Sequence, residues 1–293
     1  METKRNIFIA FILNLLFSIF ELFGGFITGS IAIASDAIHD FGDAVSIGGA
    51  YFLEKISDKK PNQKYTYGYA RFSVLGGLLT VLILLIGSGI LLYNAVLRII
   101  TPTAINHNGT LLFAIIGLTA NLVAAYFTQG GNSMNQKAVH LHMLEDVLGW
   151  LVVFIGAIIM KFTKFYIIDP ILSIVVALFV VVNALNNLMQ ILDIFLMKTP
   201  KNIHINELTE YIKKIEGVVN VHHIHIWTID GETHCATLHI VTKTADSKIK
   251  AEVKKTIKEH GVAHITVETE SLLEHCAEKS CGIKSQTKGC HHH

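Results

Sequence analysis

Two short stretches of the sequence carry the same pair of potential metal ligands at the same spacing. His39 is followed four residues later by Asp43, and His142 is followed four residues later by Asp146. On an α-helix, positions i and i+4 lie on one face, one turn apart. Two such helices side by side would bring two imidazoles and two carboxylates to one point. Four ligands of these types form a closed tetrahedral site suited to Zn²⁺, and two carboxylates would cancel the charge of the ion.

Further ionisable residues lie in the same two segments, namely Asp36, Asp40, His140 and Glu145. Such groups are costly within an apolar segment, so each is a functional candidate. We interpret Asp36, a turn or two from Asp43, as an entry or packing group. Asp40 and His140 point off the shared face, whereas Glu145 is placed to orient His142. The alternative is that these groups only join packed helices by hydrogen bonds, but the repeated spacing favours a metal site.

The composition indicates that these segments belong to a membrane protein. Hydrophobic residues make up 51% of the 293 residues and charged residues only 16%, whereas a soluble protein has about 25% charged residues. The mean hydropathy is +0.48. The net charge of +1 gives no indication of a nucleic-acid partner. Lys4 and Arg5 precede an apolar run, as in a signal peptide, but the run continues to about Ile27 without a small-residue cleavage site, so we expect a retained helix.

Six apolar segments are each long enough to cross the hydrocarbon core of a membrane. They cover approximately residues 6–27, 32–53, 74–97, 110–128, 138–160 and 169–190. The connection 54–72 is basic, with Lys55, Lys59, Lys60, Lys64 and Arg71. Positive charge favours the cytoplasmic side, which places this connection and both chain ends in the cytoplasm. Lys161 and Lys164 in the fifth connection argue mildly for the opposite orientation.

From about Thr199 the sequence has the composition of a soluble domain. The pattern predicts a helix at 203–216, strands at 218–229 and 234–242, a helix ending near Glu259 and a strand at 263–270. This α-β-β-α-β order is typical of a small α+β sandwich. We therefore expect a transmembrane domain at 1–198, a second domain at 199–272 and a flexible tail rich in Cys and His at 273–293.

The second domain contains another group of potential metal ligands. Its members are His222, His223, His225, His234, His239, His264, Glu268 and Glu270. Regular strand alternation would put His223 and His225 on one face and His222 on the other. The alternative is that these residues only form a polar strand surface.

The four cysteines all fall in the last fifth of the chain, at Cys235, Cys276, Cys281 and Cys290. This grouping suits reduced thiols or metal ligands better than a disulfide framework. The terminal residues 290–293 are either a weak metal-binding tail or an appended tag.

These motifs together resemble those of the cation diffusion facilitator family of divalent-metal transporters. Besides the paired His/Asp motifs, the resemblance includes Tyr-Gly-Tyr-Ala-Arg-Phe-Ser-Val-Leu-Gly at 67–76 and Val-His-His-Ile-His-Ile-Trp at 221–227, and it covers roughly residues 8–272. It implies an all-α domain of six transmembrane helices, a cytoplasmic α+β domain with a metallochaperone-like fold, a homodimer, and Zn²⁺ efflux coupled to proton entry. The short connection between the fourth and fifth segments resembles prokaryotic members, which implies a bacterial inner membrane.

The resemblance also implies roles for individual residues. The transport ligands correspond to His39, Asp43, His142 and Asp146, and the cytoplasmic metal ligands, which would hold regulatory Zn²⁺, to His222, His239 and Glu270. Cys276 and Cys281 lie where some members add a thiol pair, but their spacing is C-x4-C rather than C-x2-C. Resemblance further suggests a charge interlock between Arg71 and Asp193 at the membrane face.

Alternating exposure of one such site would exchange metal for protons without covalent chemistry, so we expect a transporter and not an enzyme. An intramembrane metallohydrolase would keep an open coordination position and usually a separate general base, and the sequence contains no H-E-x-x-H motif. A membrane metal sensor is the alternative of another class, but it has little use for ligands within the spans. Cd²⁺, Co²⁺, Ni²⁺, Mn²⁺ and Fe²⁺ remain alternative substrates, because affinity order alone does not select the physiological metal.

Overall fold

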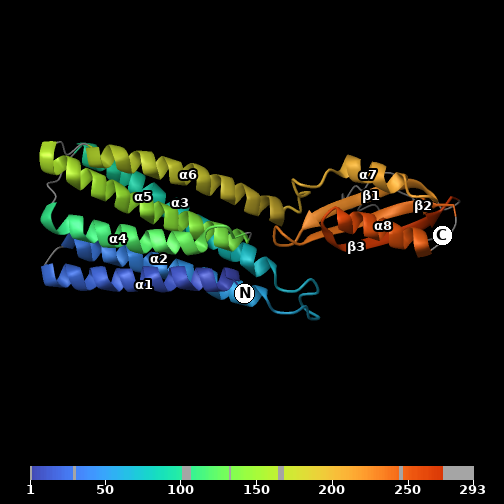
Figure 1. Cartoon of the computed structure of the whole chain (residues 1–293), viewed down its shortest axis with the longest axis horizontal. Coiled ribbons are helices and arrows are strands. Elements are labelled where there is room, and N and C mark those ends of the chain that lie inside the picture. The colour runs from blue at the N-terminus through green and yellow to red at the C-terminus, as the bar shows by residue number, and fades with distance from the viewer. Residues whose placement is uncertain are drawn as a thin grey trace, which may run out of the picture. The chain divides into compact units, whose positions relative to one another are not determined.

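The computed structural model describes residues 2–28, 31–100, 107–131, 133–163, 168–243 and 247–272. The chain divides into two compact units, one running to Leu196 and the other beginning at Met197. We call them the helical domain and the C-terminal domain (Figure 1). The tail from residue 273, with Cys276, Cys281 and Cys290, lies outside the described residues.

The helical domain contains six long helices. They are α1 (Glu2–Thr28), α2 (Ile31–Ser57), α3 (Arg71–Ile100), α4 (His107–Thr128), α5 (Met134–Thr163) and α6 (Ile168–Phe195). Each predicted apolar segment lies inside one helix, and most of the helices continue beyond the apolar segment at both ends. Four described stretches have the length and hydropathy of a membrane span: Thr3–Gly24, Arg71–Leu97, Met134–Gly156 and Ala177–Phe195.

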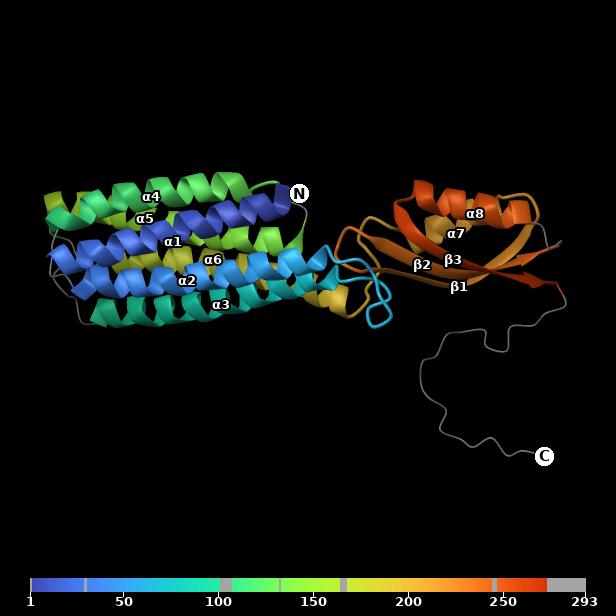
Figure 2. The ribbon, with the colours of Figure 1, turned by 90° about the horizontal axis from the view of Figure 1, so that it is seen from below.

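The helices pack in antiparallel pairs, with α1 beside α2, α3 beside α6 and α4 beside α5 (Figures 1 and 2). Two apolar clusters hold them together. The first cluster joins α1, α2, α4 and α5 through Ile7, Ile47, Ala50, Ala124 and Met143. The second cluster joins α3 and α6 to the start of α5 through Val74, Leu84, Met134, Ala138 and Ile191. Helix α5 therefore contributes to both clusters, whereas α2 belongs to the first and α3 to the second.

The C-terminal domain has the predicted α-β-β-α-β order. Its elements are α7 (Ile205–Lys213), β1 (Val218–Thr228), β2 (His234–Thr242), α8 (Ser247–Glu259) and β3 (Val262–Ser271). Helix α7 is shorter than the predicted 203–216, because the chain turns after Lys214 and reaches Gly217 with a positive φ of 92°. The sheet order is β1-β2-β3, with β1 antiparallel and β3 parallel to β2.

The core of the C-terminal domain lies between α7, α8 and one face of the sheet. It includes Leu208 and Ile212 from α7, Val253 and Ile257 from α8, and Leu238 and Ile240 from β2. Burial alternates along most of β2, so that Thr237, His239 and Val241 lie on the opposite face. The predicted fold class, a helical transmembrane domain followed by a small α+β domain, is confirmed.

Candidate metal centres

Three of the four ligands predicted within the helices come together between α2 and α5. Asp43 projects from α2, and His142 and Asp146 project from α5, one turn apart. One potential ligand atom from each of the three lies within 4.8 Å of the other two. Nε2 of His142 is 3.6 Å from Oδ1 of Asp43. The i, i+4 spacing on α5 and the approach of α2 therefore place an imidazole and two carboxylates around one point, which would supply three of the four ligands of a tetrahedral site.

The environment of His142 fits a metal ligand. The residue is only 3% exposed, and neither ring nitrogen has a hydrogen-bond partner among the described residues. Leaving a buried polar group without a partner costs about 1–3 kcal/mol. A cation held between His142 and Asp43 would satisfy one ring nitrogen and neutralise the neighbouring carboxylate.

His39, the fourth predicted ligand, lies on α2 one turn before Asp43, so helix geometry places it on the same side as Asp43. Its side chain, like that of Asp36, is outside the described residues. The assignment of His39 as a ligand remains a prediction.

Neighbouring helices contribute polar groups around this centre that the sequence did not assign to it. The amide nitrogen of Asn14 on α1, a residue 2% exposed, lies 3.4 Å from Oδ2 of Asp146. Ser88 on α3 donates a hydrogen bond of 2.7 Å to Glu145, the residue that we expected to orient His142. His140 lies 3.1 Å from the hydroxyl of Thr128 on α4. Spacing within one segment cannot reveal such partners, because they come from other helices.

Arg71 is the first residue of α3, and Asp193 lies in the last turn of α6. Since α3 and α6 pack antiparallel, both residues lie at the same end of the bundle. The interlock between them remains a prediction.

A second group of ligands lies on the sheet of the C-terminal domain, formed by His222, His239 and Glu270. Nδ1 of His239 is 2.6 Å from Oε1 of Glu270, and Nε2 of His222 is 3.3 Å from Oε2. The other nitrogen of His239 lies 3.4 Å from Glu268. Burial tends to raise the pKa of the Glu270 carboxyl, but hydrogen bonds and charge from His239 and His222 outweigh it, so this pKa lies below its usual value.

The predicted placement of His222 and His223 on opposite faces is wrong. The register steps from His222–His239 to His225–Thr237, so β1 has one more residue than β2 in this interval. The extra residue forms a β-bulge, and His223 adopts a left-handed backbone with φ 50°. Its ring consequently lies 5.1 Å from those of both His222 and His239.

The remaining predicted ligands of this domain do not join the group. His225 and His264 are exposed and pair in register with Thr237 and Cys235, further along the sheet. His234 is buried at 7% exposure, and the Cys235 side chain is fully buried. Among the described residues of this domain, the strand register therefore brings His222, His239 and Glu270 together as potential ligands.

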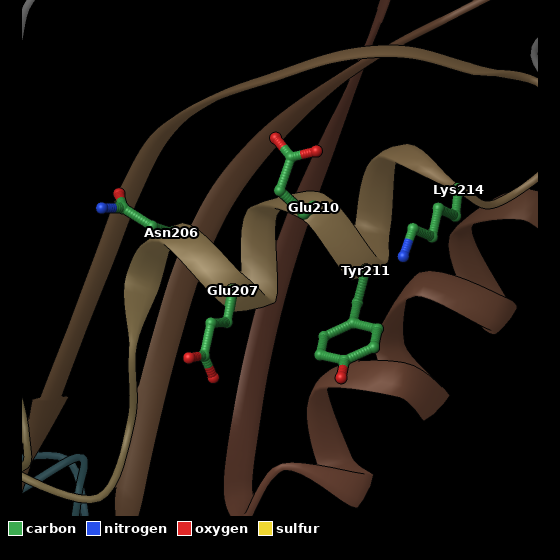
Figure 3. Close-up of a pocket in the computed structure, with 5 residues that line it drawn as sticks. All are labelled: Asn206, Glu207, Glu210, Tyr211 and Lys214. Carbon is green, nitrogen blue, oxygen red and sulfur yellow. The ribbon is translucent and has the colours of Figure 1, made fainter.

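A shallow hollow on the surface of α7 is lined by Asn206, Glu207, Glu210, Tyr211 and Lys214 (Figure 3). Two of its charged groups have local partners: Lys214 lies over the ring of Tyr211, and Glu210 pairs with Lys213. The hollow therefore lacks the converging ligands of the other two centres.

Comparison with known proteins places both domains in families. Residues 7–196 match the model of the cation efflux transmembrane domain, and residues 200–272 match the model of the cytoplasmic domain of cation efflux proteins.

Similar bacterial proteins cover nearly the whole chain. A cadmium, cobalt and zinc/H⁺-K⁺ antiporter of Bacillus subtilis is 30% identical over 99% of this chain and 96% of its own length. The zinc transporter ZitB of Yersinia pseudotuberculosis is 30% identical over 100% of this chain and 95% of its own length. The metal cation efflux system protein CzcD of Cupriavidus metallidurans is 30% identical over 91% of this chain and 86% of its own length.

Proposed function

Because the chain belongs to the cation diffusion facilitator family and is a divalent-metal efflux transporter, we propose that it exports Zn²⁺ in exchange for protons. The transport ligands in this proposal are Asp43, His142, Asp146 and His39. The observation that carries it is the convergence of Asp43, His142 and Asp146 between α2 and α5.

The ligand types support proton coupling. Zn²⁺ binds neutral imidazole and ionised carboxylate, so metal and protons compete for the same atoms. An unperturbed imidazole titrates near ~6.5. A site that faces a more acidic compartment would release Zn²⁺ and take up protons, and it would exchange them again after turning inward. The name of the Bacillus subtilis relative includes protons as a transported ion.

Zinc is favoured over other divalent cations because imidazole and tetrahedral geometry suit it. Relatives named for cadmium and cobalt as well as zinc support these two ions as alternative substrates. The deciding measurement is uptake of each metal alone and in competition.

The proposed location is a bacterial inner membrane, with both termini and the C-terminal domain in the cytoplasm. The basic connection 54–72 supports this orientation through the positive-inside rule, and the relatives described above are bacterial. We propose a homodimer, which the match of residues 200–272 to the cytoplasmic domain of cation efflux proteins supports. We assign regulatory Zn²⁺ to His222, His239 and Glu270, where two imidazoles face a carboxylate on a partly exposed sheet.

The test is Zn²⁺ uptake into inverted membrane vesicles with and without an imposed pH gradient. We expect uptake to rise when the vesicle interior is acidic and to collapse when the gradient is dissipated. Zinc binding without any flux would instead favour a membrane metal sensor. Flux that ignores the pH gradient would refute proton antiport while leaving metal transport intact.

A further inference from the structure

A buried carboxylate joins three helices at one end of the helical domain. Glu54 on α2 is only 7% exposed. Its Oε2 atom accepts hydrogen bonds from Ser73 on α3 at 2.6 Å and from the Asn135 amide on α5 at 2.9 Å. Ser133, immediately before α5, lies 3.4 Å from the same oxygen. We call Glu54, Ser73, Ser133 and Asn135 the Glu54 cluster.

Helices α2, α3 and α5 pack closely around the Glu54 cluster. The Asn135 amide also donates to the backbone oxygen of Ala50 at 2.8 Å, so it binds α2 twice. A Cβ atom on Gly76 would lie 2.9 Å from the Asn135 side chain, and one on Gly77 would lie 2.9 Å from the Met134 backbone oxygen. Helix α3 therefore needs glycine at both positions to let the start of α5 approach.

The cluster crosses the boundary between the two apolar clusters of the helical domain. Ala50 of α2 belongs to the first cluster and Val74 of α3 to the second. The hydrogen bond between Glu54 and Ser73 therefore ties α2, whose buried apolar residues lie in the first cluster, to α3, whose buried apolar residues lie in the second. Charge-assisted hydrogen bonds to a buried carboxylate are stronger than neutral ones, so this contact stabilises one arrangement of the two groups.

The cluster also lies in line with the proposed transport ligands. Asp43, Ser46, Ala50 and Glu54 follow each other on one face of α2 at helical spacing, and each is less than 9% exposed. Asp43 precedes Glu54 by eleven residues, or about 16 Å along the helix. Between them, Ser46 and Ala50 have small side chains, and the buried hydroxyl of Ser46 has no hydrogen-bond partner among the described residues.

We propose that Glu54 is a positioning residue for transport. Its carboxylate holds α2, α3 and α5 together at the end of the bundle that carries the α2–α3 connection. In this proposal, ions move past Ser46 and Ala50 between that end of the bundle and the transport ligands. The Glu54 carboxylate closes this route. The cluster must open for an ion to move along this route. The inference rests on the proposed function, because it assumes that Asp43 and its partners bind the transported ion.

The test measures access to the route independently of transport. Ser46→Cys introduces a nearly isosteric thiol in the full-length protein, in a background with Cys276, Cys281 and Cys290 replaced by serine. Labelling with a membrane-impermeant maleimide is compared in inverted and right-side-out vesicles. A separate Gln63→Cys variant, exposed in the α2–α3 connection, identifies the side on which that connection lies. The same background with Ser46 intact gives the blank, including any reaction of Cys235.

We expect Glu54→Gln and Ser73→Ala each to speed labelling of the introduced thiol from the side of the α2–α3 connection. The expected factor is about tenfold, which corresponds to the loss of one hydrogen bond to a charged group. Ser57→Ala is the matched control, since the Ser57 hydroxyl donates to the backbone oxygen of Glu54 and not to its carboxylate. This control should label at the parent rate. Ser73→Ala decides the question if Glu54→Gln does not fold.

Transport supplies the second measurement, made with Ser46 and the native cysteines in place. Glu54→Gln should lower the maximal rate of Zn²⁺ uptake while the half-saturating concentration stays unchanged. Unaltered labelling in both Glu54→Gln and Ser73→Ala would overturn the inference, whatever their transport rates. By contrast, normal Zn²⁺ uptake in Asp43→Asn would refute the proposed transport site, but the labelling experiment would still report whether the Glu54 cluster closes this end of the bundle.

Discussion

Nε2 of His142 on α5 lies 3.6 Å from Oδ1 of Asp43 on α2, with both side chains largely buried. This contact joins two segments that are about a hundred positions apart in the sequence. It places an imidazole of one segment beside a carboxylate of the other. Truncating one partner of such a pair leaves the other group buried without compensation, which is costly. Variants of this site should therefore keep the size of the replaced side chain, so that a loss of transport is not confused with a loss of folding.

Asp43→Asn and Asp146→Asn should each abolish Zn²⁺ uptake while preserving folding and dimerisation. The amide keeps the shape of the side chain but removes a charge that neutralises the ion in an apolar surround. The measurement is zinc uptake in vesicles, with size-exclusion chromatography of the purified variants. Asp40→Asn is the control, because Asp40 lies on the same helix but does not belong to the group formed by Asp43, His142 and Asp146, and it should transport. Normal flux in either of the first two variants would remove that residue from the ligand set.

His39→Asp should broaden metal selectivity. Carboxylate suits harder ions and tolerates higher coordination numbers, so Cd²⁺ or Mn²⁺ should enter alongside Zn²⁺. The pH dependence of uptake should move downward, since carboxylates titrate near ~4 and imidazole near ~6.5. Competitive uptake in vesicles measures the selectivity ratio. An unchanged ratio in an active variant would show that helix spacing, rather than His39, selects the metal.

Most of the fold could be predicted from the sequence because its signals are local. Long apolar runs specify the six helices, and the period-two pattern of 234–242 specifies β2. The approach of α2 to α5 at the metal ligands is not local, and it could be anticipated only because each helix carries half of a ligand set. Apolar segments do not mark helix ends: α5 begins at Met134, four residues before its apolar segment. Ser133, just before this helix, accepts a hydrogen bond from the Gln136 backbone.

The sequence could not reveal contacts that depend on a bulge or on a third helix. Strand alternation separates His222 from His223, and only the register shift opposite β2 brings their rings together. Glu54 resembles a charged residue at the end of an apolar segment, which would ordinarily reach toward solvent. Its burial becomes evident only when Ser73 and Asn135 are placed beside it.

Removing the proposed regulatory ligands of the C-terminal domain should reduce transport only in part. Replacing His222, His239 and Glu270 together by alanine leaves the transport ligands in place. Regulatory coupling between two sites is typically worth about 1–3 kcal/mol, so the zinc-stimulated component of uptake should fall while basal uptake persists. Uptake measured over a range of cytoplasmic-side Zn²⁺ concentrations separates the two components. Complete loss of transport in folded, dimeric protein would mean that these residues do more than regulate.

The bulge at His223 makes a prediction about stability that is separate from metal binding. A left-handed backbone is unfavourable for a residue with a Cβ by about 1–2 kcal/mol, and glycine does not incur this penalty. In a regular strand, glycine would instead weaken the sheet. We therefore expect His223→Gly to retain or increase the stability of the C-terminal domain, despite the loss of the ring contacts.

His223→Val should destabilise the same domain, because β-branched residues rarely tolerate positive φ although they favour regular strands. The measurement is hydrogen exchange of the β1 and β2 amides in the full-length, metal-free protein, which reports local opening of this sheet. His223→Ala controls for loss of the imidazole. If valine stabilised the strands and glycine weakened them, His223 would lie in regular strand conformation and the bulge would be refuted.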